Sequence, residues 1–297
     1  MPLYITAELL KPRAPFDFNQ TLAFVQDFQP ALGEQHIQNE TLSKALLING
    51  HVVVFRLRAL GSVAEPALAC TLCAESSLTA DMRRAALDRI RFFLSLDDNL
   101  IPFYAMGERD MAFAPIIDRL FGYHQVKFLT PFESACWAVL SQRNTLTVSQ
   151  GMKARLTERY GSVLRVDGVA HSVFPEAHTL ANADENELHE VVGNRMKSDG
   201  ILAVARGFLD ADEEWLRSAP YDEANAWLRG IKGIGAWSAS LILLRGLGRV
   251  ERLPVDEKWV LSAAQKVYGE AEPDLERLAA PYGEYAGYWA HYLRIAV

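Results

Sequence analysis

The sequence predicts an α+β protein in which a small N-terminal α/β domain, residues 1–112, precedes a larger all-α domain, residues 113–297. Strand and helix patterns alternate over the N-terminal part, whereas helical periodicity replaces strand patterns from about residue 113 onward. Half of the 297 residues are hydrophobic, which is enough to bury a substantial core. We therefore expect two domains that meet near residues 100–115.

The N-terminal domain is predicted to hold four strands and two helices. In chain order these are a strand over Leu3–Glu8, a helix over Asn19–Asp27, strands over Leu42–Ile48, His51–Leu60 and Ala67–Ala74, and a helix over Ala80–Leu96. Asn49 and Gly50 separate two strands and favour a tight hairpin, because both tolerate positive φ. Thr79 is expected to cap the second helix.

The C-terminal domain is predicted to be a succession of helices. The first begins at Thr130-Pro131-Phe132-Glu133, which we interpret as a capping box with proline at the first helical position, and extends to about Gln142. Further helices are predicted over Val148–Arg159, Glu185–Val192, Lys197–Leu209, Tyr221–Arg229, Trp237–Leu244, Glu257–Val267 and Pro281–Ile295.

Composition and cysteine usage indicate a soluble cytoplasmic protein. No stretch approaches the roughly 18 uninterrupted apolar residues of a membrane helix, and Met1–Arg13 lacks the features of a signal peptide. The three cysteines cannot all pair in disulfides, which favours a reducing compartment. Cys70 and Cys73 form a Cys-x-x-Cys, but residues three apart on a strand point to opposite faces and do not easily share a metal.

A glycine-rich turn lies between two predicted helices. Gly230, Gly233 and Gly235 stand within six residues and imply a tight turn without side chains. Backbone N–H groups at the start of the following helix can then approach a phosphate, where the helix dipole adds to the attraction. From the glycines alone, an ordinary αα-hairpin is an equally good interpretation.

About twenty residues after this turn, Pro254-Val255-Asp256 places a carboxylate at the start of a predicted helix. By itself Asp256 is better interpreted as an N-cap. If it faces a cleft, the same carboxylate can stabilise positive charge that develops on a deoxyribose as its base departs, or orient the attacking water.

The two elements together resemble the signature of the helix-hairpin-helix (HhH-GPD) DNA glycosylase superfamily. The run from Ile231 to Ala239, followed by Leu244-Arg245-Gly246, is most similar to the 3-methyladenine glycosylase II branch, with Ser238 in place of a threonine. The similarity extends to residues 131–161 and to Pro15-Phe16-Asp17-Phe18. It implies a small N-terminal domain with a TBP-like antiparallel sheet before a helix-hairpin-helix glycosylase domain.

The resemblance implies roles for particular residues. Asp256 becomes the catalytic carboxylate, since it occupies the aspartate of the family's Pro-x-Asp. After the damaged base is flipped out of the stack, a wedge from Gln142, Arg143 or Asn144 would fill the vacancy, although a polar surface loop is the alternative. The DNA-binding residues are then Gly230, Lys232, Gly233, Gly235, Gln142, Arg143 and Asn144.

The resemblance also suggests a base pocket and a structural ion. Alkylated purines are electron-poor, so an aromatic pocket can select them by stacking. The candidates are Trp237, Trp289, His291 and Tyr282, although aromatic residues at helical spacing are more often core. Backbone carbonyls of Gly230, Ile231 and Gly233 would hold a monovalent cation, Na⁺ or K⁺, when DNA is bound. No iron–sulfur cluster is expected, because no cysteine follows Cys136.

The resemblance favours a monofunctional enzyme that excises alkylated bases such as 3-methyladenine and 7-methylguanine. Bifunctional relatives have a nucleophilic lysine two residues after the hairpin's last glycine, and Trp237 stands there. The alternatives are a bifunctional 8-oxoguanine glycosylase/AP lyase, in which Lys197 or Lys258 would supply the amine, a catalytically silent DNA-damage-binding protein, and an unrelated all-α protein.

The expected partner is damaged double-stranded DNA, bound by a monomer that has no contact with membranes. A formal net charge of −7 opposes a general basic footprint. Acidic residues gather at Asp184–Glu190 and Asp210–Glu214, which we expect on solvated segments away from a duplex. We therefore expect modest DNA affinity with strong salt dependence.

Overall fold

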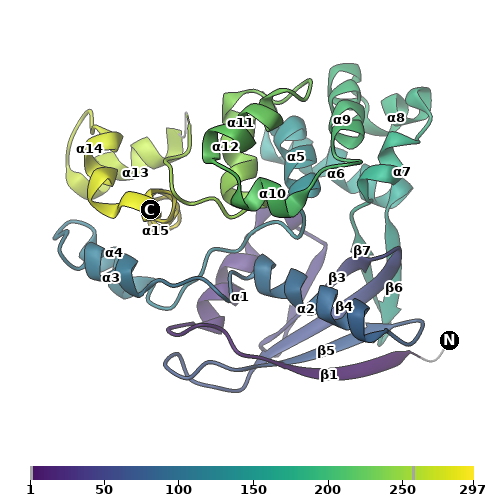
Figure 1. Cartoon of the computed structure of the whole chain (residues 1–297), viewed down its shortest axis with the longest axis horizontal. Coiled ribbons are helices and arrows are strands. Elements are labelled where there is room, and N and C mark those ends of the chain that lie inside the picture. Colours follow the sequence, from purple (N-terminus) through teal and green to yellow (C-terminus); the bar gives the residue numbers. More distant parts are fainter. Residues whose placement is uncertain (1–2, 256–257) are drawn as a thin grey trace.

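The computed structural model describes residues 3–255 and 258–297, and an antiparallel sheet underlies its N-terminal part (Figure 1). Its five strands are β1 (Tyr4–Leu10), β2 (Gln35–Gln38), β3 (Thr41–Ile48), β4 (His51–Ala59) and β5 (Leu68–Ala74). Their spatial order is β1-β5-β4-β3-β2. Asn49 and Gly50 have φ angles of 50° and 76°, which confirms the predicted hairpin turn. The short strand β2 was not predicted.

Two helices complete the N-terminal part as predicted. α1 (Phe18–Gln26) and α2 (Ala80–Phe93) pack against one face of the sheet, with a 3₁₀ turn at Gln29–Ala31 between α1 and β2. The Thr79 hydroxyl accepts a hydrogen bond from the Met82 backbone N–H at 3.2 Å, so the expected cap is present. Cys70 lies in the core on this face and Cys73 in a separate cluster on the other face, as strand geometry requires.

The prediction that strands end before residue 113 was wrong. β6 (Ser162–Val166) and β7 (Val169–Val173) form a second, two-stranded antiparallel sheet within the helical part. Leu164, Val166 and Val173 of this hairpin pack against Ala45, Val54 and Cys73 of the larger sheet. The hairpin therefore covers the sheet face opposite α1 and α2 and joins the two parts of the molecule.

Helices make up the rest of the described chain. They are α3 (Ile101–Gly107), α4 (Ala114–Arg119), α5 (Pro131–Ser141), α6 (Leu146–Tyr160), α7 (Ala177–Ala181), α8 (Glu185–Val192), α9 (Arg195–Gly207), α10 (Glu213–Ser218), α11 (Tyr221–Arg229), α12 (Ala236–Leu241), α13 (Lys258–Tyr268), α14 (Leu275–Ala279) and α15 (Ala286–Ala296). The expected domain boundary falls between α3 and α4. However, the helices on the two sides of this boundary pack together with α13–α15 in one aromatic cluster. The division into domains therefore stays a prediction.

Three local expectations need correction. The helix predicted over Pro281–Ile295 is a 3₁₀ segment followed by α15, because Gly283 has φ 50° and ψ −120°. α12 continues as a short π-helical segment, Ile242–Gly246. Thr130 caps α5 through the Glu133 N–H at 3.0 Å, but the Glu133 carboxylate pairs with Lys153 at 2.8 Å instead of closing the predicted box.

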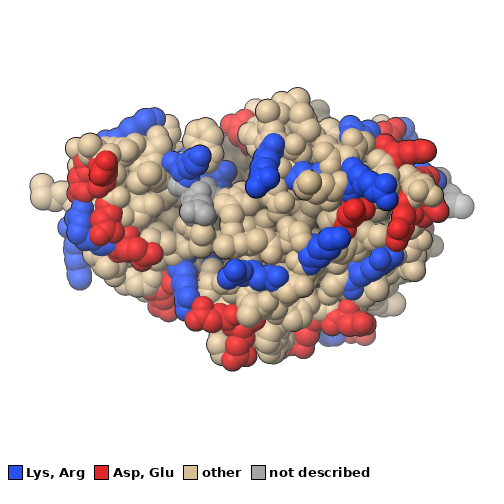
Figure 2. Space-filling model, turned by 90° about the horizontal axis from the view of Figure 1, so that it is seen from above, with Lys and Arg blue, Asp and Glu red and all other residues tan. Residues whose placement is uncertain are grey.

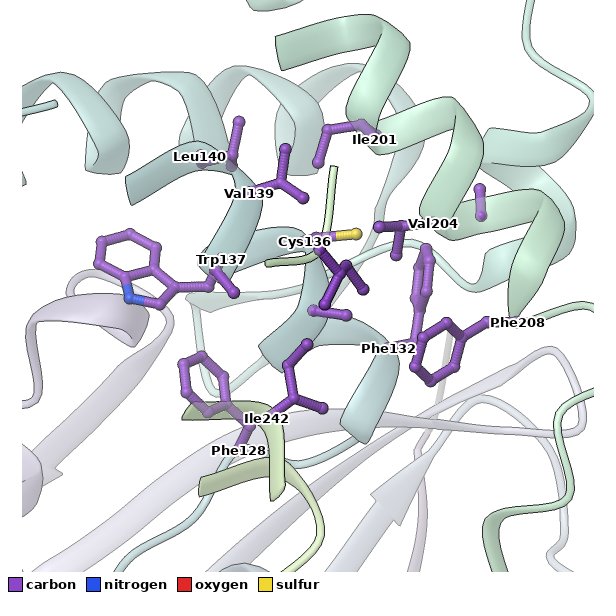
Figure 3. Packing of buried hydrophobic residues seen from close by; sticks show 14 of the residues in the cluster. Phe128, Phe132, Cys136, Trp137, Val139, Leu140, Ile201, Val204, Phe208 and Ile242 are labelled. Atoms are coloured by element: carbon purple, nitrogen blue, oxygen red, sulfur yellow. The ribbon is translucent and has the colours of Figure 1, made fainter. Parts of the chain in front are cut away.

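The helix α5 is the centre of the larger core. Every residue from Pro131 to Leu140 is buried, which explains why its sequence lacks a polar face. Figure 3 shows Val139 next to Ile201 of α9, and Phe132 beside Phe208. In the described part of the chain, no helix is long and apolar enough to cross a membrane.

Candidate nucleic-acid interface and active site

The glycine-rich turn forms a helical hairpin. α11 ends at Arg229 with Gly230 as its C-cap, and α12 begins after Gly235. Gly233 between them requires glycine because its φ is 96°. Gly235 has φ −91° and ψ −175°, and no heavy atom lies within 4 Å of the point where a Cβ would stand. No described side chain caps the start of α12, so its first N–H groups are available to an outside acceptor.

The hairpin is held against two other helices. A Cβ on Gly200 of α9 would lie only 2.8 Å from Cγ1 of Val139 in α5. The absence of a side chain at Gly200 therefore permits close contact between the two helices. A Cβ at Gly233 would lie 3.6 Å from the Gly200 Cα, which places the turn directly on α9. The Gln142 amide donates to the Gly233 carbonyl at 2.7 Å and to the Ser238 hydroxyl at 2.8 Å. The C-terminal end of α5 therefore fixes the hairpin.

The three residues predicted as a wedge take different roles. Gln142 supports the hairpin, and Asn144 donates to the Leu140 carbonyl at 2.8 Å, so both side chains are engaged within the protein. Arg143 is exposed, has φ 55° and makes no hydrogen bond to the described residues. Among the three, the structure leaves Arg143 as the side chain available to DNA.

Lys197 is a structural residue instead of a substitute nucleophile. Its ammonium donates to the carbonyls of Val139 and Gln142, both at 2.7 Å, and so satisfies the end of α5. Burial and nearby Arg143 lower the pKa of Lys197. Lys258, the other lysine considered, is exposed at the start of α13.

Basic side chains lie around the hairpin. Figure 2 shows Lys and Arg spread over the upper face, with acidic side chains mostly toward its margins. Lys232 of the turn and Arg195 of α9 are exposed, and the positive charges of both help to lower the pKa of Asp199. A hydrogen bond from His189, at 2.9 Å, is the main cause of the lowered pKa of Asp199. Arg195 was not predicted, because its only signal in the sequence is its position just before a predicted helix.

The segment that leads to the candidate catalytic carboxylate is anchored on α12 and α11. The Val255 N–H donates to the Ser240 hydroxyl at 3.0 Å. Arg252 binds both carboxylate oxygens of Asp222, at 2.8 and 2.9 Å. Asp256 itself lies outside the described residues. The segment that precedes it is thus tied to α11 and α12 of the hairpin.

A small cavity opens beside this segment. It is lined by Leu241, Leu244, Arg245, Pro254, Val260, Ala290, His291 and Arg294. His291 Nε2 lies 3.0 Å from the Tyr123 hydroxyl, and the two rings stack with centroids 5.8 Å apart. Burial, together with Arg245 and Arg294, holds the pKa of His291 well below its ordinary value. His291 is therefore a neutral ring at the cavity wall.

The other aromatic residues proposed for the base pocket lie elsewhere. Trp289 and Tyr282 are fully buried in the C-terminal core, where Trp289 Nε1 donates to the Tyr268 hydroxyl and Tyr282 donates to Asp110, both at 3.0 Å. They are core residues, so their assignment to a pocket wall was wrong. Trp237 is half-buried on α12 and packs against the α5 core.

Two backbone carbonyl oxygens of the hairpin, those of Ile231 and Gly233, can each accept one further partner, such as a cation. The Ile231 carbonyl accepts one hydrogen bond from the Ile234 N–H at 3.0 Å, and the Gly233 carbonyl accepts one from Gln142. Each oxygen keeps a second lone pair, and carbonyl oxygens suit hard monovalent ions. Among the described residues, no group of His, Cys, Asp or Glu side chains forms a metal site.

Comparison with known proteins agrees with this arrangement. Residues 136–280 match the model of the HhH-GPD superfamily base excision DNA repair protein. Over 217 residues, the chain is 24% identical to a DNA-3-methyladenine glycosylase of Bacillus subtilis, covering 71% of this chain and 72% of that protein.

Solved structures extend the similarity to nearly the whole fold. A 3-methyladenine DNA-glycosylase from Archaeoglobus fulgidus has a TM-score of 0.78 at 20% identity and covers 97% of each chain. An 8-oxoguanine glycosylase/lyase from Clostridium acetobutylicum has a TM-score of 0.71 at 16% identity, covering 98% of this chain and 97% of that one. Residues 136–280 of this chain therefore form a domain of the HhH-GPD superfamily of base excision DNA repair proteins, and the chain is a DNA glycosylase.

Proposed function

We propose that this protein is a monofunctional glycosylase that hydrolyses the N-glycosidic bond of alkylated bases, of the 3-methyladenine and 7-methylguanine type, in double-stranded DNA. The observation that carries this proposal is that the glycine-rich hairpin and the segment before Asp256 are both attached to α12. The hairpin enters α12, while Val255 is bound to Ser240 of the same helix. Asp256 is therefore expected beside the point where the hairpin would hold the DNA backbone.

The proposed chemistry requires one carboxylate and one water. As the base departs with its bonding electrons, positive charge develops on the deoxyribose, and the Asp256 carboxylate stabilises it. A water adds at the same carbon and loses a proton, which leaves an abasic sugar and a free base. An alkylated purine that carries positive charge leaves readily, so strong acid catalysis at the base is unnecessary.

The proposed DNA grip is mainly to the backbone. The uncapped N–H groups at the start of α12 and the exposed Lys232 and Arg195 would contact phosphates. Arg143 would enter the stack in place of the flipped base. When DNA is bound, the carbonyls of Gly230, Ile231 and Gly233 would hold a monovalent cation that stiffens the turn. We propose that the protein acts as a monomer.

Two observations favour hydrolysis over lyase chemistry. Trp237 occupies the place of the nucleophilic lysine of bifunctional relatives and has no amine. The buried Lys197 ammonium is fully directed to two carbonyls at the end of α5, so it is not presented to a sugar.

The test compares three matched duplexes, which contain 7-methylguanine, 8-oxoguanine or no lesion. We expect release of 7-methylguanine alone, strand cleavage only after alkali, and no covalent adduct with borohydride, because water hydrolysis forms no Schiff base. Release of 8-oxoguanine with a borohydride-trapped adduct would instead identify a bifunctional glycosylase/lyase. Binding without release from any duplex would identify a catalytically silent protein.

A further inference from the structure

A second cavity lies away from the hairpin, between the sheet and the helices. It has a volume of about 300 Å³ and lies among β3, the start of α5, the segment after β7 and the ends of α9 and α10. This volume is at the lower end of the range for small-molecule sites, which combine apolar and aromatic walls with a few polar groups. We propose that this cavity binds a planar mono- or bicyclic aromatic compound that carries an amino or amidine group.

The walls suit a flat, apolar ligand body. Phe132, Phe174 and Phe208 line the cavity, and the Phe132 ring centroid lies 6.2 Å from that of Phe174 and 5.9 Å from that of Phe208. Figure 3 shows Phe132 and Phe208 side by side at one end of the α5 core. Rings at these separations favour stacking or edge contact with another aromatic group.

The floor holds three buried charged residues, Glu34, Lys44 and Glu133, and Lys153, which does not itself line the cavity, pairs with two of them. Lys153 pairs with Glu133 at 2.8 Å and with Glu34, and Lys44 pairs with Glu34 at 3.2 Å. Burial opposes the charge of Lys153, but Glu133 and Glu34 outweigh it and raise the pKa of Lys153. Burial likewise opposes the charge of Glu34, yet Lys153 and Lys44 lower its pKa. Lys153 and Glu34 therefore stabilise each other in their charged forms.

One oxygen of this floor is left for a ligand. Glu133 is only 4% exposed and lines the cavity. Its Oε1 pairs with Lys153, whereas no hydrogen bond to Oε2 is found among the described residues. A buried carboxylate oxygen accepts most strongly from a charged N–H donor. The ligand should therefore present an amino or amidine group to Glu133.

Charge at the mouth excludes an anionic ligand. Glu176 and Glu213 lie at the rim, and the Arg89 guanidinium is already held by both carboxylate oxygens of Glu213, at 2.7 and 3.1 Å. Neither Arg89 nor Lys44 is left to bind an acid, because each already pairs with a glutamate. A neutral or cationic aromatic amine fits both the walls and the charges.

This cavity is separate from the proposed DNA site. It contacts the N-terminal end of α5, while Gln142 supports the hairpin just beyond the C-terminal end. The 11 residues of α5 span about 16 Å between them. Ligand binding can therefore be tested independently of base excision.

The experiment titrates the full-length protein with 2-aminobenzimidazole, a planar cation, and with naphthalene-1-carboxylate as the anionic control. We expect the amine to bind and the carboxylate not to bind. Glu133→Gln should weaken amine binding about tenfold, because a charged hydrogen bond is lost. Ala211→Trp, which fills the mouth without altering the buried charges, should abolish binding, and Ala271→Trp, on an exposed loop, should leave it unchanged.

Three results would overturn the proposal. They are no binding of 2-aminobenzimidazole, binding that Ala211→Trp leaves intact, and displacement of the bound amine by duplex DNA containing a lesion. The last result would place the probe in the base pocket. Because none of these measurements depends on base release, failure here is distinguishable from failure of the proposed glycosylase activity.

Discussion

Arg143 illustrates how a single backbone angle points to function. A non-glycine residue with φ near 55° costs about 1–2 kcal/mol relative to a relaxed backbone. The Arg143 side chain makes no hydrogen bond to the described protein that would offset this free-energy cost. Exposed strain of this kind is a reason to look for a ligand, and DNA is the ligand that the fold suggests.

We predict that Arg143→Gly separates DNA binding from stability. Glycine relieves the strain, but it adds about 0.4–1 kcal/mol of conformational entropy to the unfolded chain, so the two effects nearly cancel. The free energy of unfolding, measured with urea, should change by less than about 1 kcal/mol. Affinity for damaged duplex, measured by fluorescence anisotropy, should fall clearly. Unchanged affinity would remove Arg143 from the interface.

The positions of the site residues along the chain can be predicted from the sequence, but the directions of their side chains cannot. Gln142 and Asn144 were expected to contact DNA, yet their amides turn inward to carbonyls of the protein. Trp289 and Tyr282 were expected at a pocket and are core. In each case the side chain's orientation depends on a helix distant in sequence, and no local pattern reports such a neighbour.

At the level of elements, the hairpin contains two kinds of glycine. Gly233 is required by its φ of 96° and by its closeness to Gly200 of α9. Gly235 has an ordinary extended backbone with open space around it, so nothing within the described protein demands a glycine there. Its small size is explained if a phosphate approaches the start of α12.

We predict opposite outcomes for alanine at these two glycines. Gly235→Ala should keep the unfolding free energy within about 0.5 kcal/mol, because its conformation suits alanine, and should weaken duplex binding, because the Cβ stands where a phosphate approaches. Gly233→Ala should destabilise the protein by about 1–2 kcal/mol through strain at positive φ. Urea unfolding and anisotropy measure both. Normal DNA affinity in Gly235→Ala would contradict the proposed grip.

Elements with strong local signals were predicted well, and weak ones were not. α8 and α11 have the predicted bounds, and Thr79, Thr130 and Asn49-Gly50 gave reliable boundaries. β6 and β7 are five residues each and lie between helices, so their alternation was too short to recognise. Their stability comes from packing on the larger sheet, which is information that the local sequence lacks.

At the level of the whole molecule, a histidine pair joins the sheet to the β6–β7 hairpin. His36 of β2 and His171 of β7 meet edge to face with centroids 4.8 Å apart. His171 is buried, and its Nδ1 has no hydrogen-bond partner in the described structure. Burial, with His36 and Arg56 nearby, lowers the pKa of His171 to about 4. This contact therefore favours the neutral ring.

We predict that this pair makes stability depend on pH. The unfolded His171 takes up a proton near pH 6.5, but the folded one does so only near pH 4, so stability falls as the pH is lowered between these values. The loss approaches about 3 kcal/mol for this group. His171→Leu should remove that part of the decrease, measured by urea unfolding at pH 7.5, 5.5 and 4.5. A slope equal to that of the natural protein would contradict the assignment.

The overall architecture followed from the family resemblance, whereas the packing between its parts did not. The order of a sheet and then helices was expected and is present. The joint core of α3 and α4 with α13–α15, and the contact of the β6–β7 hairpin with the sheet, connect residues that are far apart in the sequence. Such contacts depend on tertiary geometry, which single-sequence periodicity does not encode.

The most direct test of the account is the single-turnover rate of 7-methylguanine release by the natural protein, Asp256→Asn and the neighbouring control Glu257→Gln. We predict that Asp256→Asn lowers the rate by at least about a hundredfold while duplex binding persists, because the lost carboxylate acts on charge that develops in the transition state. Glu257→Gln should remain close to the natural rate. Release by Asp256→Asn at a near-natural rate would contradict the central claim.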